Sequence, residues 1–126
     1  MNKTIINTSK APAPIGPYNQ AILSGNLLFI SGQVCIDPAS GELKNKDLQE
    51  ETHQVMNNLK SILTEAGLTF ENVVKTTIFL TDMHRFAEVN EIYGQYFSGN
   101  CPARETVQVS ALPKFVNVEI SMIAVK

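Results

Sequence analysis

CPARETVQV, residues 101–109, and VNVEISMIAV, residues 116–125, are the two segments that decide the fold. Apolar residues alternate with other residues along both segments, which predicts a pair of β-strands. Two charges stand out, Arg104 at the head of the first strand and Glu119 inside the second. A charge in a strand must be paired, solvated or used in function. We therefore expect the rest of the chain to hold these two charges at the wall of a small pocket.

The segments before these strands complete an α+β pattern. Turn residues between apolar runs predict a hairpin, and a one-sided apolar stripe behind a capping Asp47 predicts a helix. A β-branched run predicts a central strand, and Asp82 caps a second helix. In order, the expected elements are strands at 20–23 and 27–34, a helix at 48–66, a strand at 73–81, a helix that reaches Phe97, and strands at 101–109 and 116–125.

This order predicts one domain over residues 1–126, with a mixed sheet of about six strands and two helices packed on one face. Two helices cannot cover both faces of such a sheet. We therefore expect an oligomer to bury the second face, with clefts between its subunits.

The composition limits the classes of partner. The 126 residues carry a net charge of −2 and a pI of about 5.6 with scattered Lys and Arg, which argues against nucleic acid. No apolar run suits a signal peptide or a membrane helix, so we expect a cytoplasmic protein without a membrane partner. Cys35 and Cys101 should be free thiols, and with His53 and His84 they show no metal-binding spacing. We expect His53 to be a solvated surface residue.

Arg104 follows Pro102, which forces an extended approach and limits where the guanidinium emerges. A fixed planar guanidinium suits a carboxylate, which it grips through two parallel hydrogen bonds. A small carboxylic acid is therefore one candidate ligand. The alternative is a structural ion pair with Glu105 or Glu119, of which Glu105 is the weaker partner because adjacent strand residues point to opposite faces.

Glu119 lies between apolar strand residues, which should raise the pKa of its carboxyl toward the range useful for moving protons. Such a group could orient or deprotonate water. The alternative is a structural pair with Lys75 or Arg104. The sequence contains no phosphate-binding glycine loop and no Ser/His or Cys/His constellation, so it supplies neither a nucleophile nor a cofactor motif.

Other polar residues have a structural and a functional interpretation. Tyr18 ends a Pro-rich loop, where it could pack its ring and solvate its hydroxyl. Ser31 and Gly32 interrupt a strand, which is typical of a bulge or of a close approach by a ligand or another backbone. Asn90 borders the apolar face of the second helix, where its amide could contact solvent, an interface or a ligand.

The two C-terminal segments, with ALPKF between them, resemble the C-terminal signature of the RidA/YjgF family of small deaminases, also called L-PSP. The resemblance covers essentially the whole chain, because APAPIGPYNQA, ISGQ, VVKTTIFLTDM and VNEIYGQYF also match in order. It implies a homotrimer of chorismate-mutase-like α+β subunits with three active sites in the clefts between them.

The resemblance also implies hydrolysis of reactive enamines and imines, such as 2-aminoacrylate, 2-iminopropanoate and 2-iminobutanoate, which pyridoxal-phosphate-dependent dehydratases release. The products would be 2-oxo acids and ammonia, and the protein would need no metal or cofactor. By this resemblance Arg104 binds the substrate carboxylate, and Glu119 positions water with the help of backbone groups. It assigns the other pocket positions to Tyr18, Ser31, Gly32, Asn90 and Thr106.

Three positions depart from the family pattern. Thr106 stands where bacterial relatives often have Cys, which excludes a thiol there but keeps backbone contacts. Glu105 replaces a usually small residue, and Phe115 stands where Gly commonly follows Pro-Lys, so that turn should differ. Two other functions stay open: an RNA-cleaving inhibitor of translation, and a non-catalytic trimer that binds metabolites or guards other proteins.

Overall fold

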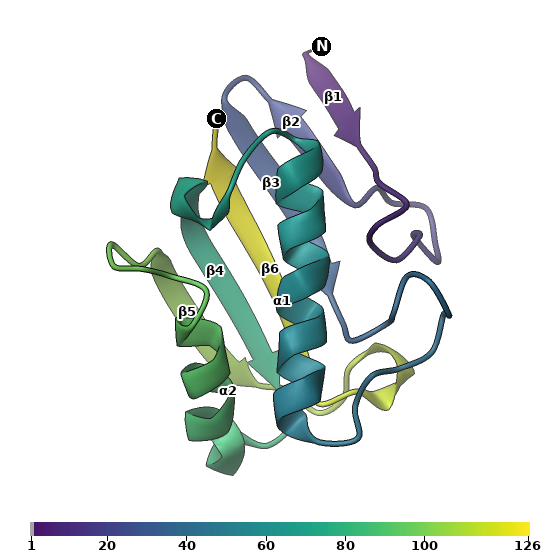
Figure 1. Ribbon diagram of the computed structural model, residues 1–126, viewed down its shortest axis with the longest axis vertical. Coiled ribbons are helices and arrows are strands. Elements are labelled where there is room, and N and C mark those ends of the chain that lie inside the picture. The colour runs from purple at the N-terminus through teal and green to yellow at the C-terminus, as the bar shows by residue number, and fades with distance from the viewer. Residues whose placement is uncertain (1) are drawn as a thin grey trace.

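The fold was analysed in a computed structural model, which describes residues 2–126. Six strands form one sheet in the order β1-β2-β3-β6-β4-β5, and two helices lie on one face of it (Figure 1). The expected α+β architecture is therefore confirmed. The strands are β1 Lys3–Ile6, β2 Ala21–Ser24, β3 Leu27–Gln33, β4 Val73–Leu80, β5 Ala103–Gln108 and β6 Val118–Val125, and the helices are α1 Leu48–Glu65 and α2 Phe86–Gly94.

The sheet is antiparallel except where β4 and β5 pair in parallel. The sequence predicted five of its strands at their places. The sixth, β1, pairs with β2 at the edge of the sheet, and most of its residues are exposed. An edge strand with so little buried surface has no clear alternation of apolar and polar residues, so its pattern did not predict it.

Helix α1 packs across β3 and β6. Its N-terminus has the expected cap, because the Asp47 carboxylate accepts a hydrogen bond from the backbone N–H of Glu50 at 2.7 Å. Gly67 follows the helix with a φ of +78°, a left-handed conformation that glycine adopts without a steric penalty. The buried face of this helix and the even-numbered residues of β6 together form the main core.

Helix α2 is shorter than the sequence predicted. Asp82 caps a single 3₁₀ turn, Met83–Arg85, and α2 begins only at Phe86. Tyr96 and Phe97 lie beyond the end of the helix, in the segment that leads to β5. The apolar pattern continued past the helix because the rings of both residues still pack against Phe70.

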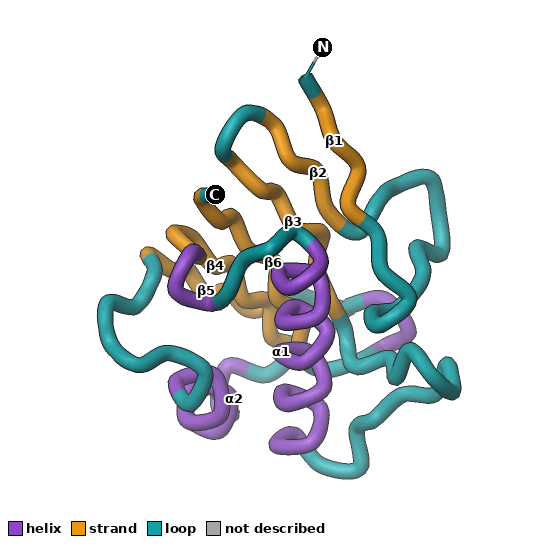
Figure 2. Tube along the Cα trace, turned by 45° about the horizontal axis from the view of Figure 1, so that its top comes forward, coloured by secondary structure: helices purple, strands orange, loops and turns teal. Residues whose placement is uncertain are grey.

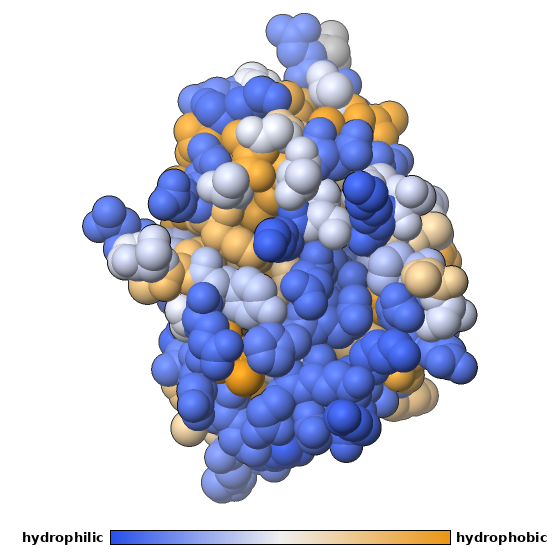
Figure 3. Space-filling model, in the orientation of Figure 1, coloured by the Kyte–Doolittle hydropathy of each residue, from blue (hydrophilic) through white to orange (hydrophobic). Residues whose placement is uncertain are grey.

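The face of the sheet opposite the helices carries apolar side chains. One row crosses four strands in register, through Ile5, Ile22, Phe29 and Ile123. Ile5 is 55% exposed and Phe29 44% exposed. Hydrophilic side chains instead cover most of the helix-bearing side, most densely over its lower half (Figure 3). The apolar row is a surface that the expected oligomer could bury.

Figure 2 shows several long connections on the side of α1 that lies away from α2, whereas the loop from α2 to β5 lies on the opposite side, and both termini lie at one end of the sheet. One of these connections is the turn Pro113–Phe115, directly before β6. Neither helix within residues 2–126 has the length and apolar character needed to cross a membrane.

The turn before β6 contains backbone strain. Lys114 and Phe115 both have a φ of +56°, a region that costs a non-glycine residue roughly 1–2 kcal/mol. The Phe115 side chain is 88% exposed, so it gains little from burial within the chain. Phe115 therefore adopts a backbone conformation that suits glycine better than phenylalanine.

We predict that Phe115→Gly raises the free energy of unfolding by up to about 1 kcal/mol, because the steric strain that glycine removes is larger than the extra entropy that it loses on folding. Phe115→Ala is the control, since it keeps the Cβ atom and hence the strain. Thermal unfolding of both variants beside the wild type measures the effect. A Phe115→Gly protein that is less stable than the alanine variant would contradict the prediction.

Candidate functional site

Glu119 lies on β6 at the wall of a cavity of about 170 Å³. The side chain is half-buried, and this burial raises the pKa of its carboxyl above the usual value. None of the ion pairs found among residues 2–126 includes Glu119, so the expected alternative of a pair with Lys75 or Arg104 is wrong. The cavity is lined on its apolar side by Pro12, Ala13, Ile15, Val34, Ile36 and Pro113.

Gly32 of β3 lies directly against the Glu119 carboxyl group. A Cβ atom built at position 32 would stand 2.8 Å from Cδ of Glu119, closer than real side chains approach. The register between β3 and β6 is irregular between Ile30 and Gln33. The bulge that the sequence predicted is present, but the group that comes close to Gly32 is the side chain of Glu119 and not another backbone.

Ser31, beside Gly32, has a structural role in this chain. Its hydroxyl donates to the backbone carbonyl of Asn19 at 2.7 Å, and its backbone N–H donates to the carbonyl of Gln20 at 2.9 Å. Ser31 thus ties the end of the N-terminal loop to the bulge, and its hydroxyl has no general base in this arrangement.

The N-terminal loop forms the other wall of the cavity through Tyr18, whose ring is 47% exposed. The loop is held by Gln20, which the sequence did not mark as important. Its buried amide nitrogen donates to the carbonyls of Thr8, Ala11 and Pro12, while its amide oxygen accepts from the N–H of Thr8 at 2.7 Å. A loop rich in proline has few donors of its own, so one buried glutamine supplies the missing bonds.

Arg104 lies on the edge strand β5, where Thr76 of β4 is its partner in register. Thr76 is buried and accepts a hydrogen bond from the Tyr93 hydroxyl, so this position faces α2. The guanidinium carbon of Arg104 lies 5.2 Å from the ring centres of both Phe86 and Tyr93. Its Nη1 donates to Oδ1 of Asn90 at 2.7 Å. Three side chains of α2 therefore orient the guanidinium.

The predicted ion pairs of Arg104 are absent from the part of the chain that the structure describes. Glu105 pairs instead with Lys75, at 2.8 Å, on the opposite face of the sheet. The Arg104 guanidinium is exposed and keeps N–H groups that Asn90 does not use. These groups are available to a carboxylate.

Arg104 and Glu119 do not share a pocket within one chain, which corrects our expectation for the two charges. Residues paired in register point to the same face, and Glu119 pairs with Phe79, which pairs with Val107. Arg104 and Val107 are three residues apart on β5, so their side chains leave opposite faces. Glu119 therefore points to the open face and Arg104 to the face that carries the helices.

Thr106 follows Arg104 on the helix-bearing face of β5. Its hydroxyl oxygen is buried and is the one buried side-chain polar atom without a hydrogen-bond partner among residues 2–126. An unsatisfied buried hydroxyl is uncommon in a folded chain, and here it lies beside an unpaired arginine. Asn90, Arg104 and Thr106 thus form one polar centre, while Tyr18, Gly32 and Glu119 form a second.

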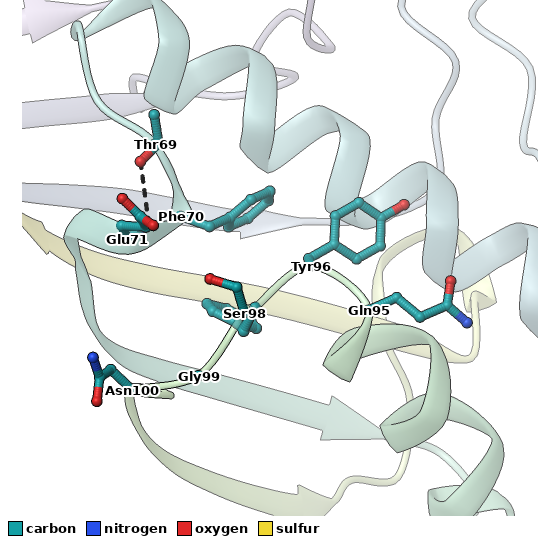
Figure 4. Close-up of a pocket in the computed structure, with 9 residues that line it drawn as sticks. Thr69, Phe70, Glu71, Gln95, Tyr96, Ser98, Gly99 and Asn100 are labelled. Carbon is teal, nitrogen blue, oxygen red and sulfur yellow. Dashed lines mark hydrogen bonds between the residues drawn. The ribbon is translucent and has the colours of Figure 1, made fainter.

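A larger surface cavity of about 710 Å³ contains none of the predicted site residues (Figure 4). It lies between the segments 69–71 and 95–100, and the rings of Phe70 and Tyr96 line it. The Tyr96 hydroxyl forms a hydrogen bond of 2.7 Å with Nδ1 of His53. The expectation of a solvated His53 is therefore wrong, because the aromatic cluster partly buries it.

No alternative reactive centre emerges within residues 2–126. No group of three or more His, Cys, Asp or Glu side chains there could hold a metal ion. Cys35 is buried, which raises the pKa of its thiol to about 11 and keeps it protonated. The two polar centres are therefore the candidate site.

The fold and these centres define a class of small α+β proteins with an arginine centre on the helix side of the sheet and a glutamate centre on the open side. Residues 8–126 match the sequence model of the family Endoribonuclease L-PSP. The chain belongs to this family, which is the RidA/YjgF family that the motifs resemble.

Individual relatives match over nearly the whole chain. Mouse 2-iminobutanoate/2-iminopropanoate deaminase is 52% identical over 124 residues, which cover 98% of this chain and 92% of the relative. The crystal structure of E. coli TdcF with bound serine has a TM-score of 0.94 at 41% identity and covers 98% of both chains. That of the E. coli YjgF gene product has a TM-score of 0.93 at 41% identity with the same coverage.

We predict that Glu119→Gln raises the melting temperature at pH 7. The pKa of Glu119 is raised in the folded protein, so ionisation of the carboxyl lowers stability above that pKa, and the penalty disappears as the pH falls below the usual value for glutamate. The gain should vanish near about pH 4. Thermal melts at several pH values measure this.

The control is Glu105→Gln, because Glu105 is exposed and paired with Lys75. This variant should show no gain at neutral pH. A Glu119→Gln protein that melts below the wild type at pH 7 would show that the ionised carboxylate stabilises the fold.

Proposed function

We propose that the protein is a hydrolase that deaminates 2-imino acids and their enamine tautomers to 2-oxo acids and ammonia. The observation that carries the proposal is the oriented Arg104 guanidinium, which has free N–H groups and no carboxylate partner among the described residues. Mammalian relatives at about half identity are 2-iminobutanoate/2-iminopropanoate deaminases, which supports it. TdcF binds serine, a small molecule with a carboxylate.

In this proposal the substrate carboxylate binds Arg104 through two parallel hydrogen bonds. Phe86 and Tyr93 hold the guanidinium from α2, and Asn90 fixes one of its nitrogens. Little side-chain freedom is then lost on binding, which favours affinity for a small ligand. Thr106 lies next to this point, and its unsatisfied hydroxyl and its backbone can take a polar group of the substrate.

Glu119 carries the proton transfers. Its carboxylate accepts a proton from a water molecule while the water oxygen bonds to C2 of the imine. The electron pair of the C=N bond moves to the nitrogen, which then takes this proton from Glu119. The resulting carbinolamine forms a C=O bond at C2 as the Glu119 carboxylate accepts its hydroxyl proton. The C–N bond breaks as this proton passes to the nitrogen, which leaves as ammonia. An enamine first becomes the imine by gaining a proton at C3 and losing one from its nitrogen. The imine is already electrophilic, so the site mainly has to orient it and deliver water and protons.

The reaction requires two chains, because Arg104 and Glu119 leave opposite faces of one sheet. We infer a homotrimer in which the open face of each subunit is covered and each cleft joins Arg104, Asn90 and Thr106 of one chain to Glu119, Gly32 and Tyr18 of the next. The apolar row from Ile5 to Ile123 supports this assembly, since it needs cover. In this arrangement Ser31 supports the pocket through the loop that it ties.

The description of the family also names an endoribonuclease, and assays of RNA cleavage and of imine turnover separate the two functions. The chain has a net charge of −2, whereas RNA cleavage needs a groove that attracts phosphates. RNA cleavage by a pure preparation that Arg104 or Glu119 substitution abolishes, without imine turnover, would favour the ribonuclease. Binding of 2-oxo acids without turnover of imines would favour a non-catalytic binding protein.

We expect the protein to accelerate 2-oxo acid release when it is added to a serine or threonine dehydratase reaction in which semicarbazide competes for the imine. Arg104→Ala should lower this acceleration about 100-fold, and Arg104→Lys should lose less, because lysine keeps the charge but not the paired geometry. Equal acceleration by the wild type and by Arg104→Ala would refute the assignment.

A mixture of two inactive variants tests the site between chains. Arg104→Ala and Glu119→Gln proteins, unfolded and refolded together in equal amounts, should regain about a quarter of the wild-type activity, since one in four clefts then receives an intact arginine and an intact glutamate. Each variant refolded alone should stay inactive. The absence of any recovery in proven mixed trimers would place both residues in one subunit.

A further inference from the structure

Glu51 is a fully buried carboxylate that the proposed reaction does not use. It lies on α1, and its Oε2 accepts the backbone N–H groups of Asn117 at 2.7 Å and Val118 at 3.0 Å. Its Oε1 accepts the side-chain amide of Asn117 at 2.8 Å. None of the ion pairs that the structure describes includes Glu51. Three N–H donors therefore satisfy this carboxylate. Two belong to Asn117, which directly precedes β6, and one to Val118, the first residue of β6.

The three bonds hold residues that directly follow a strained turn. The turn before them holds Lys114 and Phe115 at a φ of +56° each. A strained turn can relax by changing the path of the strand that follows. The Asn117 carbonyl also accepts the N–H of Thr81 at 3.1 Å, so Glu51 and the end of β4 hold this residue from two sides.

The strand start that Glu51 holds determines where Glu119 points. Strand side chains alternate between faces, so a shift of one residue at Val118 would turn Glu119 away from Gly32 and toward the core. Glu119 has no ion pair or side-chain hydrogen bond among the described residues to hold it by itself. Its orientation depends on the backbone of β6.

We propose that Glu51 is a positioning residue for Glu119, and that its buried carboxylate fixes the first residues of β6 so that Glu119 faces the cavity beside Gly32. This role rests on the proposed function of Glu119. It predicts a specific kinetic signature, because Arg104 of the other centre binds the substrate carboxylate. Loss of the Glu51 bonds should lower kcat and leave KM almost unchanged.

The test compares Glu51→Met with Glu51→Gln. Methionine keeps the length and volume of the side chain but accepts no strong hydrogen bond, whereas the glutamine oxygen can still accept the two backbone N–H groups. Glu51→Met should lower kcat at least about tenfold with KM within about twofold, and Glu51→Gln should stay within about threefold of the wild type. Thr52→Val is the control, because Thr52 is the next residue on α1, is equally buried, and bonds only to Leu48 of its own helix.

Amide hydrogen exchange gives a second measurement that needs no activity. In Glu51→Met the amides of Asn117, Val118 and Glu119 should exchange at least about 100-fold faster, while those of β1 to β3 keep their wild-type rates. If Glu51→Met does not fold, Asn117→Ala replaces it, because Asn117 is exposed and its loss removes one bond without a cavity. Asn117→Ala should then lower kcat about threefold at constant KM.

The outcomes separate the two proposals. A wild type without imine turnover refutes the proposed function, and the exchange rates alone then decide the role of Glu51. An unchanged kcat in Glu51→Met, a KM that rises in step with the fall in kcat, or exchange at residues 117–119 that is no faster than elsewhere in the sheet would each overturn the positioning role.

Discussion

The alternation of side chains along the strands is the constraint on which the rest of the structure depends. It places Glu119 on the open face of the sheet and Arg104 on the face that carries the helices, although only β4 separates their strands, β6 and β5. A reaction that needs a carboxylate anchor and a proton acceptor cannot then be completed by one chain. In the proposed trimer, a second copy covers the apolar face and supplies the missing half of the site. Oligomerisation is, in this view, part of the catalytic chemistry and not an addition to it.

Buried polar side chains connect the irregular segments to the regular ones. Gln20 holds the proline-rich loop, Asn58 on α1 donates to the carbonyls of Val34 and Ile36, and Glu51 holds the start of β6. All three act on segments that line or border the cavity beside Glu119. Each satisfies backbone groups that a loop or a strand end would otherwise leave unpaired. Loss of these bonds would leave buried polar groups without partners and lower the stability of the fold. The loop segments of the cavity wall are therefore tied to the helix and the sheet by side-chain hydrogen bonds.

Sequence patterns predicted the parts of the fold that depend on local chemistry. The helix behind Asp47, the hairpin around Gly25 and the strand before Asp82 follow from capping, turn and alternation rules, and they are present. The motifs around Arg104 and Glu119 indicated the family and both charged centres. What the sequence did not predict depends on tertiary contacts: the edge strand β1, the early end of α2, the burial of Gln20 and Glu51, and the stacking of Arg104 on Phe86 and Tyr93. The opposite faces of Arg104 and Glu119 also required the strand order, because their relative direction depends on how β4 pairs with both strands.

Unfavourable features concentrate around Glu119. The carboxylate is half-buried without a cation, Gly32 has no room for a side chain, and two residues of the preceding turn have positive φ. A chain selected for stability alone would place an apolar residue at 119 and a glycine at 115. The arginine centre shows the opposite, since stacking and the Asn90 hydrogen bond both favour the observed guanidinium position. Backbone strain is thus present in the turn before Glu119, whereas the unfavourable feature of the arginine centre is the unsatisfied Thr106 hydroxyl. In the proposed reaction, Arg104 as the binding group gains from a fixed position, whereas Glu119 as the group that moves protons needs the partial desolvation that lowers stability.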